Sequence, residues 1–455
     1  MRDERIRSGV TPEDEIAELK KIIEELRRQN AELKQELEKW KRGFRERKKR
    51  FSSRPEGQRR RAAKKPGRST GHEPAFRPVP DRVDRAVDYP IPEACACGGS
   101  VADTGEVERV IEEELPKPRV EHIAHCARVG KCRACGKRVL ARLPGAAPDG
   151  RPFARVVLGG RAQALALSLR FEHHVSQRST SRLLQRWFGL SVTPGALSQV
   201  STRRARHTRP AKAEIRVHVQ QAPVVGADET GFRQSGKSGW AWLFRTPTAS
   251  LFELNPSRGG AVLESALGRI DGVLVTDFYG VYTARKDVLH GYCGAHLIRE
   301  AKQLAEVEPS AVTREFADKL VALYKKGEAA TDFDTRESVR NTFRWMTRAA
   351  RFQKHPELAR LGKRIDQNFE GVVAFVGRDD IPWNNNASER DIRPLAVHRK
   401  IVGSTRSDAG NDALGHWMSV TQTLRKGGSH LADWLPDALV AWRSGAPPPT
   451  VFPTI

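Results

Sequence analysis

A heptad pattern of apolar residues runs through residues 13–44. One repeat position holds Ile16, Ile23, Asn30, Leu37 and Phe44, and the other holds Leu19, Leu26, Leu33 and Trp40. Isoleucine at the first position, leucine at the second and a single asparagine favour a parallel two-stranded coiled coil. A lone amphipathic helix packed on its own domain is the alternative, but the sustained heptads favour the coil. We therefore predict a coiled-coil zipper over residues 1–45 that makes the chain a homodimer or higher oligomer.

The apolar spacing is helical again over residues 151–220. The pattern breaks at Gly189 and restarts at Thr193 and Pro194, which are good residues for a helix cap and a first helical position. Helix, glycine turn and helix, followed by several arginines, suggest a helix-turn-helix over residues 150–220. Many helical hairpins bind nothing, so a DNA-binding region and a purely structural one both stay open.

Short apolar runs replace the helical spacing after Pro223. We expect strands at Val224–Ala227, Trp240–Arg245, Leu251–Leu254, Gly272–Thr276 and Gly291–Ala295, with a helix at Ala261–Ile270. This order is that of a ribonuclease-H-like domain, in which the first and fourth strands lie side by side. The fold class is therefore multidomain α/β. The core is placed at residues 221–297 and 380–410, a helical insertion at 298–379 and a helical tail at 411–455.

The charge balance points to a polyanionic partner. The chain holds 79 Lys and Arg against 55 Asp and Glu, a net charge of +24, which favours nucleic acid over a merely soluble basic surface. Residues 41–68 concentrate this charge and could neutralise DNA phosphates, within a basic linker that we place at residues 46–92. Apolar runs are too short to span a bilayer, and the charged N-terminus is unlike a secretory signal. We expect a cytoplasmic, nucleoid-associated protein without a membrane partner.

Two cysteine pairs predict a metal site at residues 93–145. One pair is Cys95 with Cys97 and the other is Cys132 with Cys135, and glycine follows the second cysteine of each pair. The four thiolates could therefore hold one tetrahedral Zn²⁺ in a zinc-ribbon-like finger. Weak strand alternation over residues 106–123 fits such a ribbon. The first pair is shorter than the commoner spacing, so His125 and Cys126 remain alternative ligands, and ordinary reduced thiols remain the other interpretation.

Carboxylates at the predicted strand ends suggest a second metal site. Asp228 follows the first strand and Asp277 the fourth, so they would face each other and repel unless a cation lay between them. Oxygen ligands of this kind suit Mg²⁺ or Mn²⁺. Glu389 on a later helix is the candidate third ligand. Glu229 should point away from Asp228, because side chains alternate along a strand.

Residues 381–400 gather asparagines and cations around Glu389. Asn386 could cap a helix, with Glu389 closing a capping box, which is the purely structural interpretation. Alternatively, Asn385 and Asn386 could bind phosphate or hold Glu389 in place. The cations of this segment could grip DNA phosphates: Arg390, Arg393, Arg399 and Lys400.

Four motifs carry a family resemblance across nearly the whole chain. They are ADET at 227–230, DFYGVY at 277–282, GAH at 294–296 and NNASERDIRPLAVHRK at 385–400. They resemble the DDE-type transposases of the insertion sequence sixty-six family. The resemblance implies metal-dependent cleavage and strand transfer of the element's ends, with Asp228, Asp277 and Glu389 as the triad. It also implies transposon-end and target DNA as partners and leaves room for accessory proteins. His296 matches a motif histidine, and Asn384 stands where the family commonly has aspartate.

Two other functions fit the same sequence. A non-catalytic regulator would need only the zinc finger, the zipper and the helix-turn-helix to bind DNA. A ribonuclease-H-like nuclease would cut DNA without joining it.

Overall fold

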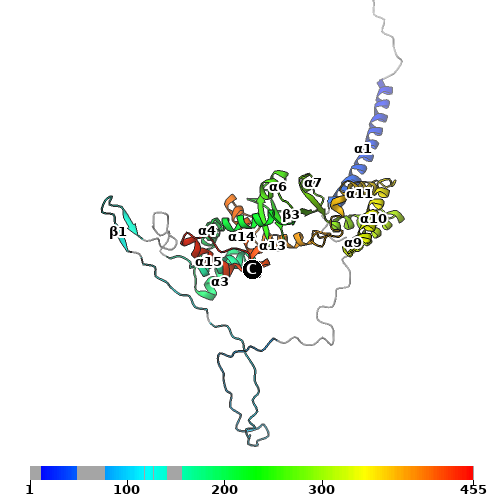
Figure 1. The fold of residues 1–455 in the computed structure, drawn as a ribbon. Coiled ribbons are helices and arrows are strands. Elements are labelled where there is room, and N and C mark those ends of the chain that lie inside the picture. The colour runs from blue at the N-terminus through cyan, green and yellow to red at the C-terminus, as the bar shows by residue number, and fades with distance from the viewer. Residues whose placement is uncertain (1–11, 49–76, 117, 127, 141–155, 454–455) are drawn as a thin grey trace, which may run out of the picture. The chain divides into compact units, whose positions relative to one another are not determined.

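The computed structural model describes residues 12–48, 77–116, 118–126, 128–140 and 156–453 (Figure 1). The chain divides into two compact units, Met1–Glu114 and Leu115–Ile455, which are treated separately below. Most of the basic tract at residues 41–68 lies outside the described residues, so its DNA contact stays a prediction. Within the described ranges, no helix is both long enough and apolar enough to cross a membrane.

The first unit contains the long helix α1 (Pro12–Lys48). Its apolar residues between Ile16 and Leu33 are largely exposed; Leu26, for example, is 52% exposed. The side chains of Leu37, Trp40 and Phe44 lie outside the described residues. The predicted helix is confirmed, whereas its pairing into a coiled coil stays a prediction.

The second unit opens with a hairpin and a group of helices. The hairpin joins β1 (Val129–Lys131) to β2 (Arg138–Leu140), and the helices are α2 (Gly160–Phe171), α3 (Gln177–Phe188), α4 (Pro194–Ala205) and α5 (Arg209–Gln220), with a 3₁₀ turn at Arg206–Thr208. Gly189 ends α3 in the left-handed region at φ 68°, which favours glycine. Thr193 caps α4 by accepting the N–H of Ala196. The predicted break and restart are therefore confirmed, and DNA binding by this region stays a prediction.

A five-stranded mixed sheet forms the centre of the second unit. Its elements are β3 (Val224–Gly231), β4 (Trp240–Arg245), β5 (Ser250–Asn255), α6 (Gly260–Leu267), β6 (Val273–Thr276), α7 (Gly280–Thr283) and β7 (Leu289–Tyr292). The strand order is β5-β4-β3-β6-β7. β3 pairs antiparallel with β4 and parallel with β6, so the predicted adjacency of the first and fourth strands is confirmed.

The last strand differs from the prediction. β7 ends at Tyr292 rather than at Ala295, and His296 lies in the first turn of the next helix. Cys293 takes the N-cap position and Gly294 begins the helix, so the GAH motif is helical rather than extended.

The remaining elements are helices, as predicted for the insertion and the tail. They are α8 (Gly294–Val307), α9 (Ala311–Glu328), α10 (Phe333–Arg351), α11 (Pro356–Gln367), α12 (Phe369–Val372), α13 (Asn386–Val402), α14 (Asp408–Lys426) and α15 (Leu431–Arg443). The helices α9, α10 and α11 lie together as a bundle (Figure 1).

Two apolar cores form where these helices cover the sheet. One core joins the sheet to α2, α5, α6, α14 and α15, and the other joins it to α8 through α12. Alternation along β6 explains the division, because Leu274 belongs to the first core while Val273 and Val275 belong to the second. The sheet is thus buried on both faces and forms a rigid base for the residues at its edge.

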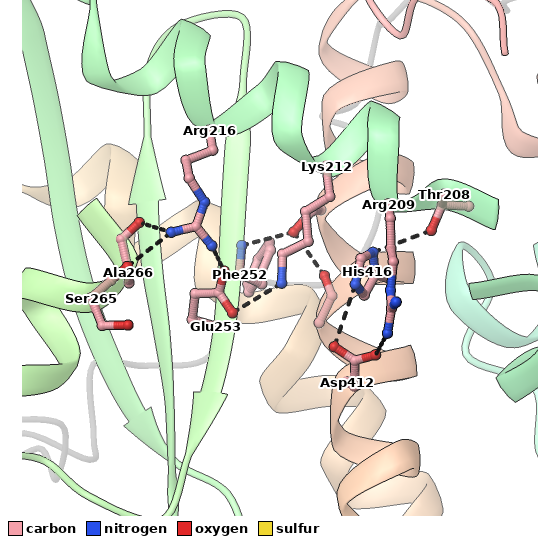
Figure 2. A network of polar contacts seen from close by, with 12 residues as sticks. Thr208, Arg209, Lys212, Arg216, Phe252, Glu253, Ser265, Ala266, Asp412 and His416 are labelled. Atoms are coloured by element: carbon pink, nitrogen blue, oxygen red, sulfur yellow. Dashed lines mark hydrogen bonds and ion pairs between the residues drawn. The ribbon is translucent and has the colours of Figure 1, made fainter. Parts of the chain in front are cut away.

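Charged side chains fasten α5 to β5 at the edge of the first core. Glu253 accepts from Lys212 at 2.9 Å and from Arg216 at 2.6 Å, and Arg216 also donates to the carbonyls of Ser265 and Ala266 (Figure 2). The side chain of Lys212 is only 9% exposed. Removing its carboxylate partner would leave a buried charge uncompensated, which is costly.

We predict that Glu253→Gln lowers the free energy of unfolding by about 2–4 kcal/mol, because the buried Lys212 ammonium and the half-buried Arg216 lose a shared carboxylate partner. Urea denaturation followed by tryptophan fluorescence measures the change. Glu315→Gln is the matched control, since its ion pair with Lys319 is exposed and should be worth less than about 0.5 kcal/mol. Equal losses in the two variants would show that the Glu253 contacts contribute no more than a surface pair.

Candidate active site

The two predicted aspartates lie beside each other on adjacent strands. The parallel pairing of β3 with β6 ends with Gly226 opposite Val275. Asp228 lies two residues after Gly226, and Asp277 lies two residues after Val275. Asp228 is not at a strand end as predicted, because β3 continues to Gly231 along β4, where Asp228 is paired with Leu243. The longer strand keeps the Asp228 backbone fixed on one side while the other side opens toward Asp277.

Helix α13 brings Glu389 to the same region by packing directly on β3. A Cβ atom at Gly226 would lie 2.5 Å from Oγ of Ser388, so only glycine permits this approach. The Asn385 side chain donates to the carbonyl of Ala227 at 2.8 Å, and its backbone N–H meets the Cys293 sulfur at 3.1 Å. These contacts position the first turn of α13, which carries Glu389.

The capping box, which was the purely structural interpretation of this segment, does not form. The N-cap position is Asn385 rather than Asn386, and it makes no side-chain cap bond because its amide is bound to β3. Glu389 instead lies with its carboxylate 3.9 Å from Nε2 of His296. Of the two roles considered for Asn385, holding Glu389 in place fits a side chain that is only 4% exposed.

Negative charge accumulates among these residues. Burial and the neighbouring Glu229, Asp277 and Glu389 carboxylates raise the pKa of Asp228 to about 7. Burial also lowers the pKa of His296, against the opposing influence of Asp277 and Glu389. The carboxylates therefore lie close enough to repel one another, which a bound cation would relieve.

The donor set fits a hard divalent cation in its chemistry. Three carboxylates are the ligands that Mg²⁺ and Mn²⁺ prefer. Over the described ranges, no three His, Cys, Asp or Glu side chains are arranged to hold an ion as they stand. The Glu389 side chain is 44% exposed and makes its ionic contact with His296 rather than with the two aspartates.

A second acidic side chain anchors the segment that carries Asp277. Glu229 points away from Asp228, as predicted, and its carboxylate is buried against Arg258 at 2.5 Å and the Tyr282 hydroxyl at 2.6 Å. Arg258 lies over the ring of Tyr279, whose backbone N–H donates to Asp277 at 2.9 Å. The ADET and DFYGVY motifs thus form one bonded network behind the site.

Asp391 anchors the other side of the site, and sequence reasoning missed it. Its carboxylate accepts from Arg245 at 2.8 Å and from Lys426 at 2.6 Å, and it thereby joins α13 to β4 and α14. Burial lowers the pKa of Lys426 to about 8. The position of Asp391 two residues after Glu389 was the available signal, but its partners lie far along the chain.

The predicted DNA-binding residues separate into two groups. Arg390, Arg393 and Lys400 are exposed, and Asn386 is exposed beside them. Helical spacing puts Glu389, Arg393 and Lys400 on one face of α13. Arg399 differs from the prediction, because it donates to Thr230 at 3.3 Å and to the carbonyl of Gly231, so it fastens α13 to β3.

Each predicted zinc pair lies in a tight turn. Gly98, with φ 86°, follows Cys97, and Gly136, with φ 69°, follows Cys135. Backbone N–H groups, those of Cys97 and Cys135 first, lower the pKa of the Cys95 and Cys132 thiols. The two turns belong to different units of the chain, so zinc binding by all four stays a prediction. Regular strands are absent from the described part of residues 106–123, so the predicted ribbon strands are wrong there.

Comparison with known families identifies the chain. The family model described as Transposase IS66 family matches residues 155–413. The chain belongs to the IS66 family of transposases. The match contains the sheet, the carboxylates and the insertion of this transposase.

Individual relatives of the transposase are more distant. The uncharacterized protein y4hP of Sinorhizobium fredii is 22% identical over 422 residues, which covers 81% of this chain and 74% of that protein. The uncharacterized protein y4jO of the same organism is 37% identical over 82 residues, 18% of this chain and 24% of that protein.

Solved structures give a weak match only. The Mos1 transposase paired-end complex with left transposon end is 15% identical, covering 50% of this chain and 81% of that chain, with a TM-score of 0.11. The Mos1 strand transfer complex is 14% identical, and the match covers 50% of this chain and 80% of that chain, with a TM-score of 0.12. Scores this low carry no argument about this transposase.

We predict that metal-free protein loses stability relative to Asp228→Asn as the pH rises from 5 to 7. The pKa of Asp228 is higher in the folded chain than in the unfolded chain. Its contribution to the free energy of unfolding is therefore fully present below the unfolded-state pKa and is lost as the pH approaches 7. The expected relative change is about 2 kcal/mol. Urea denaturation in the presence of a chelator measures it. Asp271→Asn, an exposed control, should keep the wild-type profile. Parallel profiles for wild type and Asp228→Asn would contradict the assignment.

Proposed function

We propose that this transposase cleaves and joins the DNA ends of its insertion sequence at Asp228, Asp277 and Glu389, on a ribonuclease-H-like core. The supporting observation is the register of β3 and β6 together with the packing of α13 on Gly226, which bring three carboxylates from distant segments to one sheet edge. Divalent cations bound there would activate a water or hydroxyl nucleophile and stabilise the leaving oxygen.

The residues of the chain have separate tasks in this proposal. Asp228, Asp277 and Glu389 supply the ligand oxygens. Asn385 and Asp391 fix α13, and Glu229 fixes the Asp277 segment through Arg258 and Tyr282. Arg390, Arg393 and Lys400, exposed on α13, bind backbone phosphates and hold a DNA strand along the helix.

The N-terminal segments would serve assembly and DNA capture. The exposed apolar stripe of α1 pairs with α1 of a second copy, so the transposase acts as a dimer or larger assembly on both ends of its element. Sedimentation analysis that finds only monomers would exclude this pairing. The cysteine turns hold Zn²⁺, and purified protein lacking stoichiometric zinc would exclude that site.

We predict that Asp228→Asn, Asp277→Asn and Glu389→Gln each retain DNA binding but lower strand transfer by more than about 100-fold, because each removes a charged ligand oxygen. Gel assays of binding and of joined products measure both. Magnesium should also raise the thermal midpoint of the wild type and leave that of Asp277→Asn unchanged.

Asp271→Asn is the matched control, because this exposed aspartate lies before β6 and is 76% exposed. It should keep full activity. Strand transfer retained by any of the three variants would remove that residue from the triad. Cleaved but never joined products from the wild type would favour a nuclease, and unaffected activity in all three variants would favour a non-catalytic DNA-binding protein.

A further inference from the structure

A cavity of about 490 Å³ opens next to the segment that carries Asp277. Phe278, Thr283 and Lys286 line it from the core, and Arg364, Gln367 and Asn368 line it from the junction of α11 with α12. The cavity therefore lies between the sheet and the helical insertion. The family motifs suggest no role for this insertion. Phe278 directly follows Asp277 in the chain, so one wall of the cavity belongs to the segment that carries this aspartate.

The lining is suited to an anion. It contains two cations, two amides and a hydroxyl, and none of its residues is acidic. Among the described residues Lys286 makes no ion pair, and its ammonium donates only to the Thr283 carbonyl at 2.8 Å. Arg364 binds Glu300 through one nitrogen, and its Nε is a buried atom that has no hydrogen-bond partner within the described part of the chain.

The cavity is rigid on both sides. The Phe278 ring stacks on Tyr292 at 4.3 Å, Tyr292 stacks on His290 at 5.2 Å, and the Arg364 guanidinium lies 5.0 Å from the Phe278 ring centre. On the insertion side, Asn368 donates to the Arg364 carbonyl at 2.8 Å. A site built from fixed donors loses little entropy when it binds a ligand.

Acids beside the cavity are paired with arginines: Asp287, next to Lys286, pairs with Arg285, Glu300 pairs with Arg364 itself, and arginines of α10 pair with two acids of the insertion. Asp366 lies next to Gln367 in sequence and pairs with Arg348 and Arg351. Glu370 follows Asn368 by two residues and pairs with Arg340 and Arg344. These ion pairs reduce the repulsion that a polyanion would meet at the junction of α11 with α12.

We propose that this cavity binds a backbone phosphate of the DNA strand whose reacting phosphodiester lies at Asp277. This inference rests on the proposed function and assigns the helical insertion a part in holding the DNA. Successive phosphates of one strand are spaced ~3.4 Å along the duplex axis, so a strand held at Asp277 would carry further phosphates past Phe278 toward the cavity. Lys286 supplies the charge, Arg364 orients an oxygen, and Gln367 and Asn368 donate from the insertion.

The test compares two substitutions in the cavity with two matched ones outside it. Lys286→Gln removes a charge from the cavity and Gln367→Glu adds a repelling one; both residues are exposed, so folding should be preserved. Lys325→Gln on α9 and Gln353→Glu after α10 make the same changes at exposed positions that do not line the cavity. DNA affinity of the full chain is measured without magnesium over a series of salt concentrations.

We expect Lys286→Gln to weaken duplex binding about threefold to tenfold and to lower the log–log salt slope by about 1. Gln367→Glu should weaken binding to a similar extent, and the two controls should match the wild type. Cavity variants that behave like their controls would overturn the proposal, as would a wild type that binds no DNA. A wild type that shows these binding effects but joins no ends would instead overturn only the transposition proposal.

Discussion

Electrostatic repulsion among carboxylates is the constraint around which this core is built. Asp228, Asp277 and Glu389 come from separate segments. Burial first, and then the Glu229, Asp277 and Glu389 carboxylates, raise the pKa of Asp228, so gathering these acids costs free energy. Each segment is therefore anchored behind the site by an ion pair or an amide bond. Glu229 with Arg258, Asp391 with Arg245 and Lys426, and Asn385 with Ala227 supply those anchors.

These anchors explain why charged residues stand side by side in two of the family motifs. In the NNASERD segment, Asn385 and Asp391 face the protein while Glu389 and Arg390 face outward. In ADET, the Glu229 carboxylate is bonded to Tyr282, whereas Asp228 on the other face of β3 lies near the Asp277 and Glu389 carboxylates. A motif of consecutive charges thus encodes both the carboxylates of the candidate site and the contacts that hold them in position.

The sequence predicted much of this arrangement, because local patterns decide helices and strands. Gly189, Thr193 and Pro194 indicated the turn between α3 and α4, and the apolar runs indicated the order of the strands. Alternation placed Glu229 correctly. The sequence could not show that Arg245 and Lys426 bind Asp391, or that Asn385 bonds to β3 rather than to its own helix. Those contacts join residues far apart along the chain, and no local pattern specifies them.

The shared first core has a consequence for how the chain can be divided. Phe171 and Ile215, from the helices before the sheet, are buried in the same cluster as Leu243 of β4 and Trp417 of α14. A recombinant fragment that begins at the first strand would expose this apolar surface to water and tend to aggregate. The helices that precede the sheet therefore cannot be exchanged between relatives as an independent module. A chimera between this chain and a relative would have to keep α2 through α15 from the same protein.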